Sequence, residues 1–190
     1  GDDACSSDLK TCDESANGCF STKQEFNISG NHFQQLKQKG CSSSDCVPLA
    51  FTATLGNQRT FGYTQQCCQG EKCNQKDFPL FQKSSDTNGI ECPACYTEND
   101  NSCVPTPLKC TGAETKCVMV TGEEYQGGGF SLMFVARGCA TETACNLKDL
   151  TVLGGVKVHT SCPGITNASS PLMSTISSVL ASIFLLKILL

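Results

Sequence analysis

Tryptophan is absent from this chain of 190 residues, and only His32 and His159 are available as bases at neutral pH. No Gly-x-Ser-x-Gly, His-Glu-x-x-His or glycine-rich phosphate-binding motif occurs. His32 falls at a predicted turn and His159 late in a predicted strand, so both are expected to be exposed or cross-strand residues. We therefore expect no catalytic residues, no metal, no cofactor and no enzymatic activity.

Positive charge is also scarce, with 14 Lys and Arg against 18 Asp and Glu. Residues 1–90 hold 8 basic and 10 acidic side chains, and residues 91–190 hold 6 and 8. Because no basic patch stands out, a nucleic acid partner is not expected. Convincing helical periodicity is missing before Ser170, which favours a β fold.

Cysteine, in contrast, is abundant, at 16 of 190 residues or about 8%. Such a density is typical of disulfide-rich domains that fold in oxidising compartments, and it places the chain outside the cytosol. Disulfides rather than a large apolar core are expected to supply much of the stability.

The cysteines repeat with a spacing of 98 residues. The first four repeated positions are Cys5, Cys12, Cys19 and Cys41, and their counterparts are Cys103, Cys110, Cys117 and Cys139. Relative to the spacing of 98, Cys145 follows the position expected from Cys46 by one residue, and Cys162 precedes the position expected from Cys67 by three residues. The repeat predicts two modules, residues 1–76 and 91–166, with a Pro/Ser/Asp/Asn-rich linker at 77–90.

Each module shows short β segments separated by turn residues. In the first, residues 19–28 and 33–41 flank the turn 29–31, and residues 51–55 and 60–63 flank Gly56-Asn57. In the second, residues 117–120 and 130–136 flank Gly127–Gly129, and residues 151–153 and 156–158 flank Gly154-Gly155. Two hairpins are therefore expected in each module.

The end of the first module, Gln66–Gln75 or "QCCQGEKCNQ", resembles the C-terminal segment of the lymphocyte-antigen/urokinase-receptor (LU) three-finger family. The pairs Gly40-Cys41 and Gly138-Cys139 and the opening Cys92-Pro93-Ala94-Cys95 are similar to the same family. The resemblance covers nearly the whole chain before the tail. It implies an all-β, disulfide-rich fold of two tandem three-finger (snake-toxin-like) domains.

The eight cysteines of one complete module allow 105 pairings, so the pairing is taken from the resemblance. It implies, for the first module, the bridges Cys12–Cys41, Cys46–Cys67 and Cys68–Cys73. For the second module it implies Cys92–Cys117, Cys95–Cys103, Cys110–Cys139 and Cys145–Cys162. Cys5 and Cys19 are left unpaired, and their partners are expected in a Cys-x-x-Cys within about ten residues upstream of Gly1.

Three other interpretations of the cysteines remain open. Cys92 and Cys95 could form a redox dithiol, although this chemistry usually needs a helix N-terminus in a βαβ setting. They could also be half of a zinc site, which needs four convergent ligands. Cys67 and Cys68 could form a vicinal disulfide. The second module lacks a counterpart of residues 68–74, which leaves its C-terminal closure open.

After Cys162 the sequence becomes polar and then apolar, as in a GPI-attachment signal covering residues 167–190. Asn167-Ala168-Ser169 offers small residues at the cleavage point, and we expect attachment at Asn167. A polar-leaning spacer, residues 170–178, precedes the apolar run 179–190. A membrane-spanning helix is the alternative, but it needs about 20 apolar residues and usually a basic flank.

Asn27-Ile28-Ser29 is a glycosylation sequon near the tip of a predicted hairpin, and we expect a glycan on Asn27. The predicted fingertips, residues 27–33, 56–61, 123–130 and 153–156, are expected to contact a partner. Aromatic residues are enriched at such contacts. The candidate binding residues are therefore Phe33, Phe61, Tyr125 and Phe130, although each could instead cover the small core.

Within the LU family, the sequence looks most like a group with an intestinal surface member that binds bacterial flagella, a bone-associated member and gamma-type phospholipase inhibitors. The resemblance implies a GPI-anchored glycoprotein on the extracellular face of the plasma membrane that binds an extracellular protein. Receptor, adhesion and host-defence roles, including binding of bacterial surface structures, fit this description. The alternative is a secreted phospholipase inhibitor, and a thiol oxidoreductase is a third hypothesis.

Overall fold

The computed structural model describes residues 9–27, 33–42, 46–79, 83–98, 100, 102–126, 129–152 and 155–164. Within these ranges the regular structure is β strand with two single-turn 3-10 helices, which confirms the predicted all-β class. The first module contains β1 (Gly18–Asn27), β2 (Phe33–Ser42), β3 (Leu49–Leu55), η1 (Gly56–Gln58) and β4 (Thr60–Cys68). The second contains β5 (Thr87–Glu98), β6 (Thr106–Thr111), β7 (Lys116–Gln126), β8 (Gly129–Ala140), η2 (Glu142–Ala144), β9 (Leu150–Val152) and β10 (Val156–Ser161).

The strands of the first module form an antiparallel sheet in the order β2-β1-β4-β3. Both predicted hairpins are present, and Cys19 lies directly opposite Cys41 in the β1–β2 register. Along β3, side chains alternate between half-buried and buried, with Phe51, Ala53 and Leu55 on the buried face. One face of this sheet is therefore apolar, as the period of two in a strand requires.

The second module repeats this plan and adds a further hairpin. Strands β8, β7, β10 and β9 lie side by side in that order, and Cys117 is opposite Cys139 as Cys19 is opposite Cys41. The additional hairpin consists of β5 and β6, and the end of β5 also pairs with β8 over Cys95–Glu98. Residues 87–90, assigned to the linker by sequence, belong to β5.

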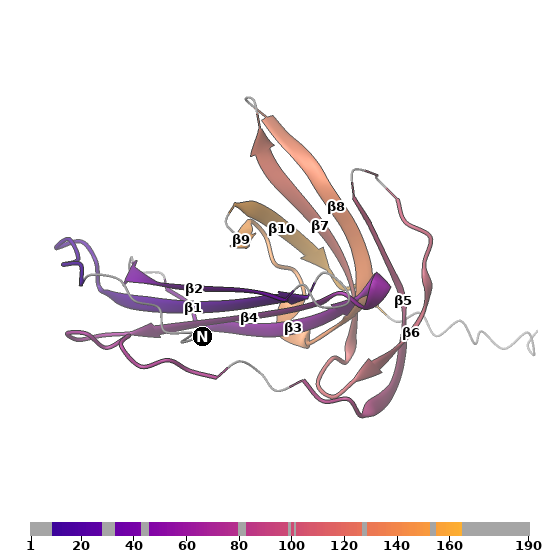
Figure 1. The fold of residues 1–190 in the computed structure, drawn as a ribbon, viewed down its shortest axis with the longest axis horizontal. Helices are drawn as coiled ribbons and strands as arrows, with labels where there is room; N and C mark the ends of the chain where they lie inside the picture. Colours follow the sequence, from indigo (N-terminus) through magenta and orange to yellow (C-terminus); the bar gives the residue numbers. More distant parts are fainter. Residues whose placement is uncertain are drawn as a thin grey trace, which may run out of the picture.

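The two modules share one continuous sheet, because β3 of the first pairs with β8 of the second. The register joins Ala53, Thr54 and Leu55 to Ala140, Cys139 and Gly138. From this junction the β1–β4 sheet and the β7–β8 hairpin diverge, so the strands of the two modules form the arms of a V (Figure 1). A single apolar core fills the angle near the junction and takes side chains from both modules.

Seven disulfides hold the described strands together, and they are the same seven pairs that the LU resemblance implies. They are Cys12–Cys41, Cys46–Cys67, Cys68–Cys73, Cys92–Cys117, Cys95–Cys103, Cys110–Cys139 and Cys145–Cys162. Cys19 carries a free thiol, and Cys5 lies outside the described residues. In the second module, Cys92, Cys110 and Cys139 are almost completely buried and form a compact sulfur core with Ile90 and Leu108 around it.

Candidate binding site at the junction of the two modules

The hairpin turn Gly56–Gln58, predicted to be an exposed fingertip, begins with a residue packed against the second module, while Asn57 and Gln58 are exposed. Gly56 is buried, and a Cβ atom on it would overlap the backbone of Cys95. From the other side, a Cβ on Gly138 would overlap the carbonyl oxygen of Thr54. Only glycine at both positions allows the two backbones to approach this closely.

Hydrogen bonds close the same junction. The amide of Thr141 donates to the carbonyl of Thr52 at 3.0 Å, and the amide of Thr52 donates to the Thr141 hydroxyl at 3.1 Å. The Thr143 hydroxyl donates to the carbonyl of Ala50 at 2.6 Å. The backbone of β3 at the boundary is thereby paired on the side of the second module, as buried polar groups require.

Arg59 of the first module adds contacts with charged and aromatic side chains of the second module. Its guanidinium lies 3.6 Å from the centre of the Tyr96 ring and 3.4 Å from a carboxylate oxygen of Glu98. The Tyr96 ring in turn stacks on Phe134, with 5.5 Å between ring centres. Burial raises the pKa of Tyr96, and the charge of Arg59 opposes that rise. Arg59 therefore acts as a clamp from the first module onto β5.

An apolar cavity lies between the two modules beside this clamp. Its volume is about 40 Å³, it is partly open to solvent, and its wall exposes no polar atom. Phe26, Phe51 and Phe61 line it from the first module, and the ring of Phe61 lies 6.0 Å from that of Phe26 and 5.7 Å from that of Phe51, between centres. Val118, Val120, Phe134, Val152 and Val158 line it from the second.

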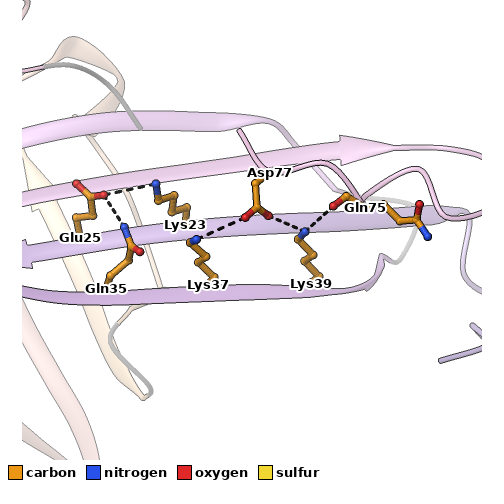
Figure 2. A network of polar contacts seen from close by, with 7 residues as sticks. All are labelled: Lys23, Glu25, Gln35, Lys37, Lys39, Gln75 and Asp77. Carbon is orange, nitrogen blue, oxygen red and sulfur yellow. Dashed lines mark hydrogen bonds and ion pairs between the residues drawn. The ribbon is translucent and has the colours of Figure 1, made fainter. Parts of the chain in front are cut away.

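A charged network lies along the β1–β2 hairpin (Figure 2). Asp77 accepts from Lys39 at 2.7 Å and Lys37 at 3.5 Å, and Lys39 also donates to the carbonyl of Gln75 at 3.0 Å. The hydrogen bond from Lys39 holds the pKa of the Asp77 carboxyl below its usual value, with further help from the charges of Lys39 and Lys37. These contacts fasten residues 75–78, which we call the strap, across the hairpin.

Hydrogen bonds fix the beginning of the second module. The amide of Gly112 donates to the carbonyl of Asp86 at 2.9 Å, and the Asn88 side chain donates to the carbonyls of Gly112 and Glu114 at 3.0 Å each. Glu114 is itself buried. Burial lowers the pKa of Lys83, and the charge of Glu114 partly offsets that effect. The connection between modules is therefore anchored at both described ends.

The residues predicted to bind a partner, to carry a glycan or to hold the anchor fall in three different settings. Phe61 is half-buried and lines the cavity, so it faces the second module rather than an exposed fingertip. Asn27 is the last residue of β1, opposite Thr60 and Phe33. The side chains of Phe33, Tyr125 and Phe130 lie outside the described part, as do Asn167 and His32.

The geometry of Cys92, Cys95 and His159 bears on the redox, zinc and acid–base chemistry that these residue types can carry out. Cys92 and Cys95 belong to two different bridges, to Cys117 and Cys103, so they do not form a dithiol with each other. The sulfur atoms of Cys92, Cys110 and Cys139 lie within 4.8 Å of one another, but all are in disulfides and lack the thiolate that zinc binds. His159 is 4.0 Å from Asp149 and 39% exposed.

Sequence reasoning missed the residues that build the junction. The alternation of Leu49, Phe51, Ala53 and Leu55 indicates an apolar strand face, but it does not say that a second module covers that face. In the sequence, Gly138 stands out only as part of a family signature. Arg59 lies within a predicted fingertip, and nothing in the sequence distinguishes it there. A glycine followed by a cysteine inside a strand was the available signal of close backbone approach.

These features define a class: a disulfide-rich β protein built from two three-finger modules that share a sheet. The u-PAR/Ly-6 domain model matches residues 1–76 and 88–170, and the chain belongs to that family. Members of the family are generally non-enzymatic, and the family includes secreted and GPI-anchored proteins.

Three relatives illustrate the range of the family. The chain is 45% identical to Protein RoBo-1 of Rattus norvegicus over 150 residues, which is 78% of this chain but only 61% of that protein. It is 30% identical to the phospholipase A2 inhibitor NAI of Notechis ater, over 87% of this chain and 84% of that protein. It is 29% identical to Ly6/PLAUR domain-containing protein 8 of Bos taurus, over 90% of this chain and 79% of that protein.

Within the described part of the chain, no helix has the length and apolar character needed to cross a bilayer.

Proposed function

We propose that this chain is a non-enzymatic glycoprotein, held by a GPI anchor at the extracellular face of the plasma membrane, that binds an extracellular protein. The observation that carries the proposal is the rigid frame: disulfides and a shared core fix the described strands of both modules, and the hairpins extend from that frame. Such preorganisation favours binding because less conformational entropy is lost on association.

The proposed contact surface is formed by the hairpin ends of β1–β2 and β7–β8. The β7–β8 end points away from the junction (Figure 1), whereas the β1–β2 end, at Asn27 and Phe33, lies beside Thr60 at the junction end of the first sheet. Gly56 is excluded, since it is packed on the backbone of Cys95. Phe33, Tyr125 and Phe130 stay candidate contacts, and the glycan on Asn27 would lie at the end of the first hairpin. Partners of the receptor, adhesion or host-defence type, including bacterial surface proteins, fit a surface of this kind.

The anchor is tested on cells that display the chain. Phosphatidylinositol-specific phospholipase C should release the protein into the medium, and Asn27→Gln should remove one glycan from the released form. Interrupting the apolar run by changing Leu185 and Leu186 to Asp should abolish surface display while leaving secretion intact. Surface protein that resists the lipase would contradict the anchor.

Partner binding is tested separately with the released protein. Tyr125→Ala and Phe130→Ala should each weaken capture of a surface protein by at least tenfold. Val104→Ala, at an 88% exposed side chain outside the proposed surface, serves as the matched control. Equal binding by all three variants would remove the β7–β8 end from the proposal.

The second candidate function is secreted inhibition of a phospholipase A2. It is favoured by the 30% identity to an inhibitor of that enzyme over 84% of the inhibitor's length. Spontaneous secretion with an intact C-terminus, together with stoichiometric inhibition of a secreted phospholipase A2, would support it over the anchored binding protein.

A further inference from the structure

The apolar cavity between the modules has the dimensions of a small ligand site. A site for one water-sized group needs about 10–15 Å³ on the scale on which this cavity measures about 40 Å³. There is therefore room for roughly three such groups, a volume that the end of one unbranched hydrocarbon chain would fill. The partial opening to solvent leaves a path for the rest of such a chain.

The wall restricts the ligand to hydrocarbon. Thr160 is the one residue of the wall with a polar side chain, and its hydroxyl is already engaged. It accepts from the amide of Leu147 at 2.8 Å and donates to the carbonyl of Ala144 at 2.5 Å. A water molecule inside would find no hydrogen-bond partner, and cavities of this kind stay dry and take up apolar molecules.

The cavity is held open by rigid surroundings. Its walls come from two modules whose separation is fixed at the junction by the close approach at Gly56 and Gly138. The stacked pairs Phe51–Tyr63 and Tyr96–Phe134 brace the side chains on either side. Closing the space by collapse would require the two modules to move against these contacts, so the site is preformed.

We propose that this cavity binds the end of a single aliphatic chain, with the polar end of the same molecule left outside. Phe26, Phe51 and Phe61 contact the chain from the first module, and Val120, Phe134 and Val158 contact it from the second. The ligand is a molecule such as a fatty acid or a lipid with an accessible acyl chain. This site is separate from the β7–β8 hairpin end proposed to bind a protein, whereas Phe26 of its wall directly precedes Asn27 at the β1–β2 end.

The test uses the full chain purified without detergent or lipid, with dodecanoate as the probe below its micelle concentration. Isothermal titration should show saturable binding of one chain per protein, and the methyl signals of Val120 and Val158 should shift in NMR spectra. Shortening the probe to octanoate should change binding little, because the end of the chain still fills the cavity. Propanoate and acetate should bind more weakly, by a factor of roughly four for each methylene missing from the cavity.

Two variants fill the cavity from different sides. Ala53→Leu, on β3, and Ala144→Leu, on η2, each place extra carbons in the space and should weaken dodecanoate binding by at least tenfold. Ala50→Leu is the matched control, since it lies on the same strand as Ala53 with its side chain on the opposite face. Circular dichroism identifies any variant that fails to fold. In that case the dodecanoate affinity of the other filled variant tests the proposal.

Co-flotation with phosphatidylcholine vesicles separates the two sources of the chain. Flotation that is lost in both filled variants but kept in Ala50→Leu identifies a bilayer lipid, whereas binding of dodecanoate without such flotation identifies a free fatty acid. The proposal is overturned if folded wild-type protein fails to bind dodecanoate, or if a folded filled variant binds it as tightly as the wild type.

Discussion

At the scale of single residues, two glycines decide whether the modules can meet. Gly56 and Gly138 lie on opposite sides of the junction, and each has backbone atoms of the other module where a Cβ would be. Backbone atoms cannot rotate away as a side chain can, so an added methyl group must push the strands apart.

Gly138→Ala is therefore expected to lower the free energy of unfolding by about 1–3 kcal/mol. Gly155→Ala is the matched control, because no atom lies within 4 Å of its Cβ position, and it should change stability little. Urea denaturation followed by circular dichroism measures both. Equal midpoints for the two variants would mean that the junction tolerates expansion.

Arg59 contributes through its planar guanidinium as well as its charge. Arg59→Ala should lower the free energy of unfolding by about 1–2 kcal/mol, since a largely buried stack on Tyr96 is lost. Lys72→Ala removes an exposed pair with Glu71 and should change it by less than about 0.5 kcal/mol. A double-mutant cycle with Tyr96→Leu isolates the stacking contribution, and a coupling energy near zero would argue against the clamp.

At the scale of elements, the strap of residues 75–78 depends on a charge. The pKa of Asp77 is lowered in the folded state, so its contribution is complete above the ordinary value of 3.8 and is lost as pH falls through the lowered value. At neutral pH the strap is held by both lysines, and it should loosen only in acid.

Asp77→Asn removes the charge at every pH. We expect faster hydrogen–deuterium exchange over residues 75–78 at pH 7 in this variant, together with loss of the acid dependence expected for the wild type. Lys23→Ala is the control, because it breaks the Lys23–Glu25 pair on the same hairpin without touching Asp77. Unchanged exchange in Asp77→Asn would show that the strap is held by other contacts.

At the scale of the whole molecule, the shared sheet and core tie two repeated modules into one cooperative unit. Phe51 and Tyr63 of the first module belong to the same buried cluster as Val118 and Val158 of the second. Separating the modules would expose this cluster to water at a cost of about 25 cal/mol for each Å² of apolar surface.

Thermal unfolding with all disulfides intact is therefore expected to occur in a single transition. Differential scanning calorimetry should give a calorimetric enthalpy equal to the van't Hoff enthalpy for the whole chain. Two resolved transitions, one for each module, would show that the junction is too weak to couple them.

The sequence alone determined the repeated and local features of this protein. A repeated spacing of cysteines predicted the number of modules, short β segments separated by turn residues predicted the strands, and a family resemblance supplied the same disulfide pairs that the structure contains. These properties depend on residues close in sequence or on a pattern present twice, so they can be read without coordinates.

Only the tertiary structure decided how the modules meet. Alternation along β3 gives that strand one apolar face, but the surface that covers it comes from β7, β8 and β10, which lie far away along the chain. Packing of that kind turned a predicted fingertip at Gly56 into a buried contact and moved Phe61 from a predicted partner surface to the wall of a cavity. The physical reason is that apolar burial is non-directional, so a strand's own sequence does not specify which distant surface will exclude water from it.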